Sequence, residues 1–297
     1  MGSDLDVLWF SSPDREFETD WIRELFFMSG MGIEIKFIDE SYEPSGKPTV
    51  LICGFRSEYR KVLRKISLAR VPYGVILLSD EHLIEPMECL RDPNCFFYLR
   101  NYFKAEVATH PKVGFFGIGY KNGFRDGPSF GDNDGAVWAF MGAMRAGERE
   151  RCLASFADIG PNRILLTKTF NDPAGMKTED YKKILGESIF ALCPRGPVNA
   201  ETFRVYEALE AGCIPVVTGT DNYVRAPRIY WELLFAHRNV PFVIGGTWED
   251  CANKVKSLLE NPAAIRRKKE ECRRFYALLK HEWASQFRRA FATLQEK

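Results

Sequence analysis

Two arginines and a glutamate near the middle of the chain stand at a spacing suited to binding a nucleotide. Arg195 lies in the turn-forming stretch Pro194–Pro197, and Arg204 and Glu207 follow it, three residues apart. On a helix, residues three apart share one face. Arginines and the free N–H groups of a helix start can hold a diphosphate, and a carboxylate one turn further can accept hydrogen bonds from ribose hydroxyls. The alternative is an ordinary amphipathic helix on which Arg204 and Glu207 form a surface pair.

The elements that must position these side chains are predicted by the same stretch. An apolar run at 189–192 predicts a strand, and Asn199 predicts the N-cap of a helix over about 200–211. Gly212 predicts the end of that helix, and 213–217 is the next apolar strand. A β-turn-α-β unit this short implies parallel strands joined by a right-handed crossover. The turn after the first strand then lies at the carboxyl edge of a sheet, where open α/β folds bind ligands.

This stretch resembles the donor-binding signature of exostosin-like glycosyltransferases, in the branch that includes ribitol xylosyltransferase and homologues from bacteria and algal viruses. The resemblance is carried by Pro194-Arg195-Gly196, by Phe203-Arg204 and by the run from Glu207 to Val216. It implies a GT-B fold, in which two Rossmann-like domains enclose a cleft and a C-terminal helix crosses back to the first domain. It also implies a nucleotide-sugar donor, inversion at the anomeric carbon and no bound metal or other cofactor.

The expected donor site includes residues from the signature and from a segment before it. Its members are Arg145, Arg151, Arg195, Asn199, Thr202, Arg204 and Glu207. We assign Arg204 to the diphosphate and Glu207 to the ribose. Trp138-Ala-Phe-Met-Gly142, which is followed by three arginines, resembles the family segment that opens the donor domain, and either Arg145 or Arg151 is expected to face the phosphates. The alternative is that these arginines are solvated on a helix.

A second group of reactive side chains, Asp80, Glu81 and His82, directly follows the apolar run 74–78. An inverting sugar transfer needs a base that takes the proton of the acceptor hydroxyl, and a partly buried carboxylate suits that role. We predict Asp80 as the base because it comes first after the strand, with Glu81 as the alternative. The competing interpretation is that Asp80 only caps a helix beginning at Glu81. If neither carboxylate is the base, Asp14 is the next candidate.

Three residues are expected on the acceptor side of the site, and they are His82, Arg100 and Tyr120. The motifs Ser-Asp-Glu at 79–81 and Leu-Arg-Asn-Tyr at 99–102 recur in this branch of the family. Residues 117–124 resemble the family sequence Pro-Leu-Gly-Tyr-x-x-Gly-Phe, with Gly117-Ile118 in place of Pro-Leu. This replacement changes the expected rigidity of the loop.

The order of predicted elements gives an α/β chain with parallel, doubly wound sheets. Strands are predicted at 6–10, 33–38, 49–53, 74–79, 95–99, 113–116, 136–144, 164–169, 189–192, 213–217 and 241–244. Helices are predicted at 17–28, 57–69, 147–156, 178–185 and 200–211, with two more over 247–278 and a last one over 281–294. A Gly/Asp-rich stretch at 126–135 marks a hinge. We therefore predict an acceptor domain at 1–134, a donor domain at 135–280 and a returning helix at 281–297.

Composition and missing motifs exclude several function classes. The 41 basic and 40 acidic side chains give a formal net charge of +1, which argues against nucleic acid or an anionic membrane surface as the main partner. The cysteines and histidines lack metal-ligand spacing, and no P-loop or dinucleotide signature is present. We interpret Asp132-Asn133-Asp134 as a loop and not as a metal motif.

No apolar run is long enough to predict a membrane span. The chain as given is therefore expected in the cytoplasm. A lumenal location is the alternative if Met1-Gly2-Ser3 stands where a natural anchor was removed.

We expect an inverting, metal-independent glycosyltransferase that moves a sugar onto a hydroxyl of a glycan acceptor. UDP-xylose is the first candidate donor because the nearest branch of the family suggests it, and GDP-fucose, UDP-galactose and UDP-glucuronic acid remain open. The alternative from another class is a catalytically silent protein that binds a nucleotide sugar or a glycan on the same fold.

Overall fold

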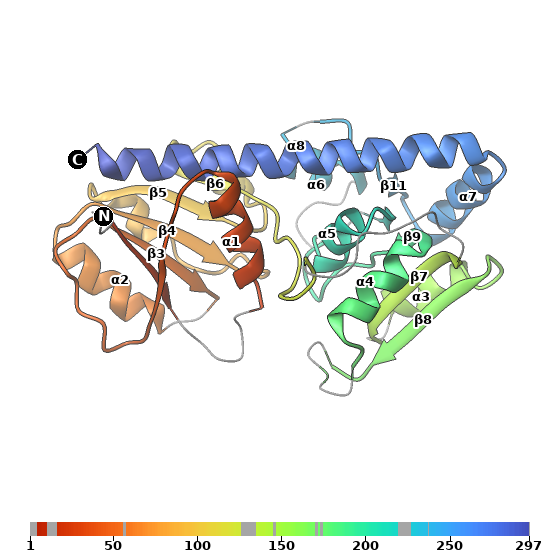
Figure 1. Cartoon of the computed structure of the whole chain (residues 1–297), viewed down its shortest axis with the longest axis horizontal. Coiled ribbons are helices and arrows are strands. Elements are labelled where there is room, and N and C mark those ends of the chain that lie inside the picture. The colour runs from red at the N-terminus through yellow and green to blue at the C-terminus, as the bar shows by residue number, and fades with distance from the viewer. Residues whose placement is uncertain are drawn as a thin grey trace. The chain divides into compact units, whose positions relative to one another are not determined.

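A computed structural model describes most of the chain, and Figure 1 shows its course. The described residues are 5–10, 17–55, 58–125, 135–144, 147–169, 172, 175–218, 227–236 and 238–296. The chain forms two compact units, a first unit of Met1–Ile118 with Lys280–Lys297 and a second unit of Gly119–Leu279. The change from one unit to the other thus comes earlier than the boundary at 134 that the sequence suggested, and the loop after 118 belongs to the second unit.

The first unit is built on a six-stranded sheet in the order β2-β1-β3-β4-β5-β6, and every pair of neighbours is parallel. Its strands are β1 (Asp6–Phe10), β2 (Ile35–Ile38), β3 (Thr49–Gly54), β4 (Tyr73–Leu78), β5 (Cys95–Arg100) and β6 (Val113–Phe115). Its helices are α1 (Thr19–Met28) and α2 (Tyr59–Leu68), with short 3₁₀ turns at Glu88–Arg91 and Ala105–Val107. β4 is buried along its whole length, as expected for a central parallel strand covered on both faces.

One face of this sheet is covered by α2, and aromatic side chains of the C-terminal helix pack in the same unit. Trp283 contacts Trp21 edge to face with ring centroids 5.8 Å apart. The ring centroid of Phe287 lies 5.7 Å from that of Phe26 and 5.1 Å from that of Phe116. Each such pair contributes about 0.5–1.5 kcal/mol beyond the area it buries. These contacts confirm that the C-terminal helix returns to the first domain.

The second unit is built on a five-stranded parallel sheet in the order β11-β10-β9-β7-β8. Its strands are β7 (Ala136–Ala143), β8 (Asn162–Thr167), β9 (Ser188–Leu192), β10 (Ile214–Val217) and β11 (Val243–Ile244). Its helices are α3 (Glu148–Ser155), α4 (Thr178–Gly186), α5 (Phe203–Glu210), α6 (Pro227–Leu234) and α7 (Trp248–Leu259). The chain leaves β7 toward β8 on one side and later continues from β9 toward β10 on the other. The order therefore reverses between β7 and β9, which is where open α/β sheets bind ligands.

The C-terminal helices differ from the prediction. After α7, a single helix α8 runs from Pro262 to Gln295, in place of a charged helix before 278 and a separate tail helix from 281. No Gly or Pro follows Pro262, so nothing in the sequence interrupts the helix. Residues up to Leu279 belong to the second unit, and those from Lys280 belong to the first. α6 was not predicted.

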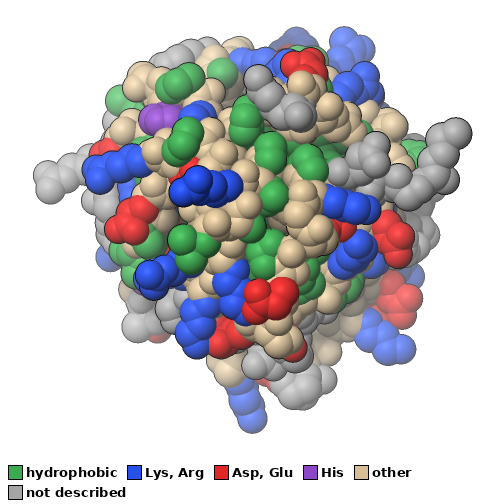
Figure 2. Space-filling model, turned by 90° about the vertical axis from the view of Figure 1, so that its left-hand side faces the viewer, with side chains coloured by type: hydrophobic (Ala, Val, Ile, Leu, Met, Phe, Trp, Pro, Cys, Tyr) green, Lys and Arg blue, Asp and Glu red, His purple; other side chains and the backbone are tan. Residues whose placement is uncertain are grey.

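The face of the molecule drawn in Figure 2 carries acidic and basic side chains interspersed with hydrophobic ones. This mixture agrees with a net charge near zero. No helix among the described residues combines the length and the apolar composition that a membrane crossing requires.

Candidate functional site

The start of α5 lies three residues later than the sequence predicted. Asn199 does not cap the helix, because its Oδ1 accepts a hydrogen bond from the backbone N–H of Glu201 at 3.0 Å in a local turn. Short polar side chains often make such turns in competition with a helix. Thr202 is the N-cap residue, and α5 begins at Phe203. At the other end, Gly212 has φ +74°, which confirms the predicted terminating glycine.

Arg204 lies across the point where the strand order reverses. Its Nε donates to the carbonyl oxygen of Met141 in β7 at 3.0 Å, and its Nη1 donates to that of Pro194 after β9 at 3.3 Å. Among the described residues, Nη2 makes no hydrogen bond. The side chain is half-buried, so its guanidinium is fixed in place while part of it stays accessible. A cation held at this edge is suited to bind a diphosphate.

Gly142 makes room for that guanidinium. It has φ +148°, and a Cβ at this position would lie 3.1 Å from Nη2 of Arg204. A larger residue would therefore combine a backbone conformation that side chains disfavour with a close contact to the arginine.

Thr202 offers a polar atom at the start of α5. Its side chain is buried, and Oγ1 has no hydrogen-bond partner among the described residues. Buried hydroxyl groups are normally satisfied. A phosphate oxygen accepts hydrogen bonds and would supply the missing partner.

Glu207, one helical turn after Arg204, is buried with its carboxylate already bonded. It accepts hydrogen bonds from the backbone N–H of Lys121 and from the hydroxyl of Tyr181. Burial raises the pKa of Glu207, and the charges of Lys121 and Arg204 act in the opposite direction. The carboxylate therefore ties the loop after residue 118 and α4 to α5, and it is held in one orientation beside Arg204.

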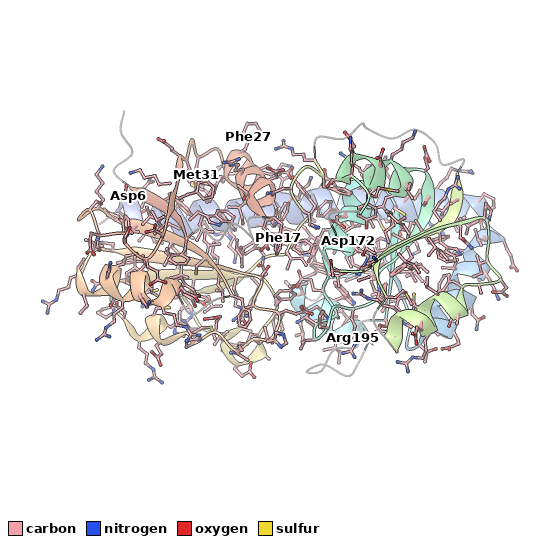
Figure 3. All side chains as sticks on the ribbon, turned by 90° about the horizontal axis from the view of Figure 1, so that it is seen from below. Asp6, Phe17, Phe27, Met31, Asp172 and Arg195 are labelled. Carbon is pink, nitrogen blue, oxygen red and sulfur yellow. The ribbon has the colours of Figure 1, made fainter. Side chains whose placement is uncertain are left out.

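Arg195, labelled in Figure 3, is held by an ion pair. Its Nε lies 2.7 Å from Oε2 of Glu148 at the start of α3. The other carboxylate oxygen of Glu148 accepts from Thr218 at 3.2 Å and from the indole N–H of Trp248 at 3.3 Å. About a third of the Arg195 side chain is exposed, so it keeps an accessible part beside α3.

The three arginines around the start of α3 take different positions. Arg145 lies outside the described residues. Arg151 is exposed on α3, and its charge acts on Glu249 of α7. Arg149 is buried and donates to the carbonyl oxygen of Ala143 at the end of β7. The buried arginine of α3 is therefore Arg149, which we did not choose from the sequence. Cys152, three residues later on the same face of the helix, is also buried.

In the first unit, Asp80 is fully buried and engaged by three donors. Its Oδ2 lies 3.0 Å from Nη2 of Arg100 and accepts from the backbone N–H of Glu85 at 3.2 Å, while Oδ1 accepts from that of Ile84 at 3.1 Å. Arg100 is itself fully buried. Arg100 thus supports Asp80 from within the protein and does not present its guanidinium to solvent on the acceptor side. No helix begins at Glu81, because the residues after it form turns.

Glu81 and His82 are the accessible members of this group. Glu81 is half-buried and His82 is exposed. The turn that carries them begins at Ser79, a non-glycine residue with φ +59°. Asn101 accepts from the Ser79 N–H at 2.9 Å, and Glu18 accepts from its hydroxyl at 2.7 Å. The unusual backbone conformation is therefore fixed by contacts on both sides.

Among the remaining predicted residues, Tyr120 lies apart from the Asp80 turn, which belongs to the first unit. Tyr120 is fully buried in the second unit, where its ring lies 6.1 Å from that of Phe124. It packs in that unit's core. Asp14 and Asp132–Asp134 lie outside the described residues.

Among the residues that the structure describes, no three His, Cys, Asp or Glu side chains are placed to hold a metal ion together. All eight cysteines are free thiols.

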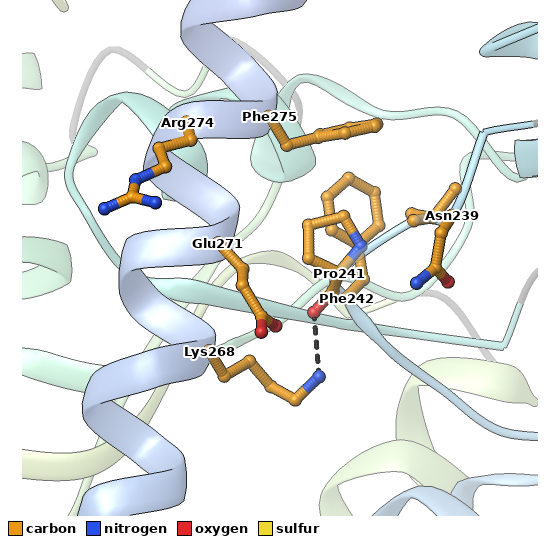
Figure 4. Close-up of a pocket in the computed structure, with 8 residues that line it drawn as sticks. Asn239, Pro241, Phe242, Lys268, Glu271, Arg274 and Phe275 are labelled. Atoms are coloured by element: carbon orange, nitrogen blue, oxygen red, sulfur yellow. Dashed lines mark hydrogen bonds between the residues drawn. The ribbon is translucent and has the colours of Figure 1, made fainter.

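A pocket lies elsewhere in the second unit. It has a volume of about 480 Å³ and lies between α8 and the segment before β11 (Figure 4). Lys268 closes one side by donating to the carbonyl oxygen of Pro241 at 3.1 Å. None of the predicted donor-site residues lines it, so we place the candidate site at the strand ends.

A family model and several solved structures match this chain. Residues 166–295 match the family model of the RXYLT1 C-terminal domain. This match contains α5 with Arg204 and Glu207, and it confirms the resemblance to the ribitol xylosyltransferase family that the signature indicated. No curated protein matches the sequence.

The structural matches show the fold. The chain is similar to the DNA-modifying enzyme β-glucosyltransferase, with 13% identity, a TM-score of 0.52 and coverage of 96% of this chain and 98% of that one. It is similar to an α1,3-fucosyltransferase, with 12% identity, a TM-score of 0.53 and coverage of 91% and 83%. It is also similar to the Thermobaculum terrenum O-GlcNAc transferase, with 14% identity, a TM-score of 0.52 and coverage of 97% and 66%. The chain has the GT-B fold, and family and fold together support glycosyltransferase activity with a nucleotide-sugar donor.

Proposed function

We propose that this chain is an inverting glycosyltransferase that moves a sugar from a nucleotide diphosphate to a hydroxyl of a glycan acceptor without a metal ion. The observation that carries the proposal is Arg204, held by the carbonyls of Met141 and Pro194 at the reversal of the strand order with Nη2 unused by the described residues. A half-buried guanidinium at that edge matches the place and the charge that a diphosphate requires.

The donor diphosphate binds between Arg204 and the start of α5. The N–H groups of the first turn and the Thr202 hydroxyl donate to phosphate oxygens, and the guanidinium offsets the negative charge that grows as the sugar leaves. Glu207 lies one turn further along the helix, and its buried carboxylate holds Lys121 and Tyr181 beside Arg204, so the ribose assigned to it from the sequence is not kept. These hydrogen-bonding groups of the protein are fixed before the nucleotide sugar binds, so they do not need to reorganise during the reaction.

Glu81 is the base, and Asp80 holds it in position. The sequence ranked these two carboxylates in the other order. Asp80 is buried, and both its oxygens accept hydrogen bonds, so it has no direct path to an acceptor hydroxyl. Glu81 is half-buried on the same turn and stays accessible. It takes the proton of the acceptor hydroxyl as the oxygen attacks the anomeric carbon and the nucleoside diphosphate leaves.

UDP-xylose is the proposed donor, supported by the match to the RXYLT1 C-terminal domain. The structurally similar proteins include one described with UDP-glucose and one that transfers fucose, so the fold does not decide the sugar. A panel of UDP-xylose, UDP-galactose, UDP-glucuronic acid and GDP-fucose, offered with a generic glycoside acceptor, tests the assignment. Turnover of UDP-xylose above the others supports it, and selective turnover of GDP-fucose refutes it.

Metal independence is tested with a chelator. A structurally similar T4 phage enzyme has been solved with UDP and Mn²⁺, which makes the question a direct one for this fold. We expect full activity in excess EDTA, because arginine and backbone N–H groups supply the positive charge. Loss of activity that Mn²⁺ restores would refute the proposal and direct attention to Asp132–Asp134.

The alternative is a catalytically silent protein that binds a nucleotide sugar or a glycan. Incubation with the donor panel in the absence of acceptor separates the two, because a transferase slowly hydrolyses its donor to free sugar and nucleotide. Donor that binds but stays intact over many hours, with and without acceptor, would favour the silent protein.

A further inference from the structure

An aromatic pair lies beside the Glu81 turn at the carboxyl edge of the first unit's sheet. Phe55 directly follows β3, and its N–H donates to the carbonyl oxygen of Leu78 at 3.1 Å, which continues the β3–β4 pairing by one residue. The rings of Phe55 and His82 then lie 6.0 Å apart and 30° from parallel. Phe55 is half-buried and His82 is exposed, so an aromatic surface faces solvent next to the proposed base.

The backbone around this pair is held in conformations that are costly for side chains. Ser79, Leu83 and Tyr102 all have φ between +55° and +59°, and all follow β4 or β5 at the same edge. Lys104 fixes the far end of the turn, since its ammonium donates to the carbonyl oxygen of Leu83 at 2.8 Å. Such strain persists only where surrounding contacts determine it, and it gathers at ligand sites. The turn is therefore built to hold Glu81 and His82 in fixed places.

The position in the sheet is also one that favours a ligand. In the order β2-β1-β3-β4-β5-β6, the chain leaves β1 toward β2 and later continues from β3 toward β4, so the direction reverses between β1 and β3. Phe55 follows β3, one of the two strands that flank this point. Ligands of open α/β sheets bind outside the carboxyl ends of such strands.

We propose that Phe55 and His82 form the acceptor platform, on which a pyranose ring of the glycan acceptor stacks. This inference rests on the proposed function and names the part of the acceptor that the site recognises. The apolar C–H face of a sugar ring packs against aromatic side chains, while the imidazole exchanges hydrogen bonds with hydroxyl groups at the ring edge. A ring stacked there presents its hydroxyls beside Glu81, which follows Asp80 and precedes His82 in the same turn.

The charge at this edge favours a neutral ligand over a polyanion. Glu81 is an accessible carboxylate within the platform's own turn, and the net charge of the chain is only +1. A phosphate backbone placed on the platform would meet that carboxylate, and a nucleic-acid partner needs several cations to offset its charge. A glycan carries no such cost.

The test is binding of the full chain to a broad glycan array, with Phe55→Ala, Phe55→Trp and Phe27→Ala as variants. Phe27 is the matched control, because it is a phenylalanine 73% exposed on α1, and Figure 3 shows it pointing away from the ribbon. We expect the wild type to bind at least one glycan class. Phe55→Ala should weaken that binding about tenfold or more, Phe55→Trp should retain it, and Phe27→Ala should equal the wild type.

Calorimetry with UDP separates this inference from the proposed function. UDP binding that is the same in wild type and Phe55→Ala, together with a selective loss of glycan binding, supports the platform. Three results overturn the platform while the donor site stands. They are glycan binding that survives in Phe55→Ala, no glycan binding by the wild type, and binding of double-stranded DNA by the wild type that Phe55→Ala abolishes. Absence of UDP binding and of donor hydrolysis in the wild type overturns the proposed function itself.

Discussion

At the scale of single residues, the charged side chains of the two candidate sites are held in place by contacts within the protein. Arg204 is held by carbonyls at the ends of β7 and β9, and Asp80 by Arg100 and two N–H groups of its own turn. Glu207 is held by Lys121 and Tyr181. Each contact fixes orientation before any ligand binds, which is what catalysis by preorganised charge requires.

Replacing Arg204 by alanine should weaken UDP binding. A hydrogen bond to a charged group contributes about 1.5–3 kcal/mol, so the affinity should fall roughly 10- to 150-fold. Titration calorimetry measures the change directly. Arg151→Ala is the control, since Arg151 is exposed on α3, and its UDP affinity should equal that of the wild type. Equal affinities for Arg204→Ala and the wild type would show that the diphosphate binds elsewhere.

The two carboxylates of the β4 turn should respond differently to neutralisation. Glu81→Gln should lower turnover about 10²- to 10⁴-fold, the usual contribution of a general base, with little change in stability. Asp80→Asn should instead destabilise the fold by roughly 3–5 kcal/mol, because it leaves the charge of buried Arg100 unpaired. Turnover and urea denaturation of both variants give the comparison. A fully stable Asp80→Asn with lost turnover would return the role of base to Asp80.

The stability contributed by Glu207 should depend on pH. Burial raises the pKa of Glu207 above its ordinary value of 4.5, so the fold favours the protonated form. As the pH rises from 4.5 through the higher folded value, ionisation costs more in the folded than in the unfolded state, and the wild type loses stability. Glu207→Gln mimics the protonated form at all pH values. It should therefore be more stable than the wild type at pH 7, and the difference should vanish below pH 4.5, as followed by urea denaturation. A constant difference across this range would contradict the assignment.

At the scale of elements, the strand order marks the points at which open α/β sheets bind ligands. In each unit the strand order reverses once, between β1 and β3 in the first and between β7 and β9 in the second. Arg204 of α5 donates to carbonyl oxygens near the carboxyl ends of β7 and β9, and Phe55 directly follows β3. The long helix α8 contributes aromatic side chains to the core of the first unit, so it stabilises the sheet that carries the Glu81 turn.

Removing one aromatic side chain of α8 tests that contribution. Phe287 is fully buried against Phe26 and Phe116, and Phe287→Ala should lower the free energy of unfolding by about 3–5 kcal/mol through lost burial and a cavity. Leu278→Ala is the control on the same helix, because Leu278 is 50% exposed and its loss should change the stability little. Chemical denaturation compares the two, and similar costs for both would mean that α8 does not build this core.

At the scale of the whole molecule, the balance of charge is the property that bears on the class of acceptor. A GT-B fold does not decide the acceptor, since one structurally similar protein is described as DNA-modifying. With 41 basic and 40 acidic side chains, this chain has few cations in excess to replace the counterions of a phosphate backbone.

We therefore expect no measurable binding to double-stranded DNA at physiological salt. Any residual binding should be weaker than the usual non-specific range of about 10⁻⁴–10⁻⁶ M. Fluorescence anisotropy of a labelled duplex measures this, with a basic DNA-binding protein as the positive reference. Micromolar binding that falls steeply with added salt would contradict the expectation and reopen the acceptor class.

The sequence alone determined the features that depend on local spacing. The alternation of apolar runs and amphipathic segments was sufficient for two parallel α/β sheets, because strands and helices each have a short repeat. The signature around Arg204 and Glu207 indicated a family resemblance, which the match of residues 166–295 to the RXYLT1 C-terminal domain confirms. Trp283, Phe287 and Phe291 follow one another at intervals of four residues, and all three are buried on one face of α8.

Only the tertiary structure decided which of several similar side chains is buried and which stays accessible. The sequence led us to predict Asp80 as the base, because it does not show that Asp80 pairs with buried Arg100, 20 residues away. The sequence also contained no sign of Phe55, because its ring contact with His82 depends on the pairing of β3 with β4. The hydrogen bond that fixes Arg204 spans 63 residues to Met141. Local repeats specify elements, but the direction of a side chain depends on contacts between elements that only folding brings together.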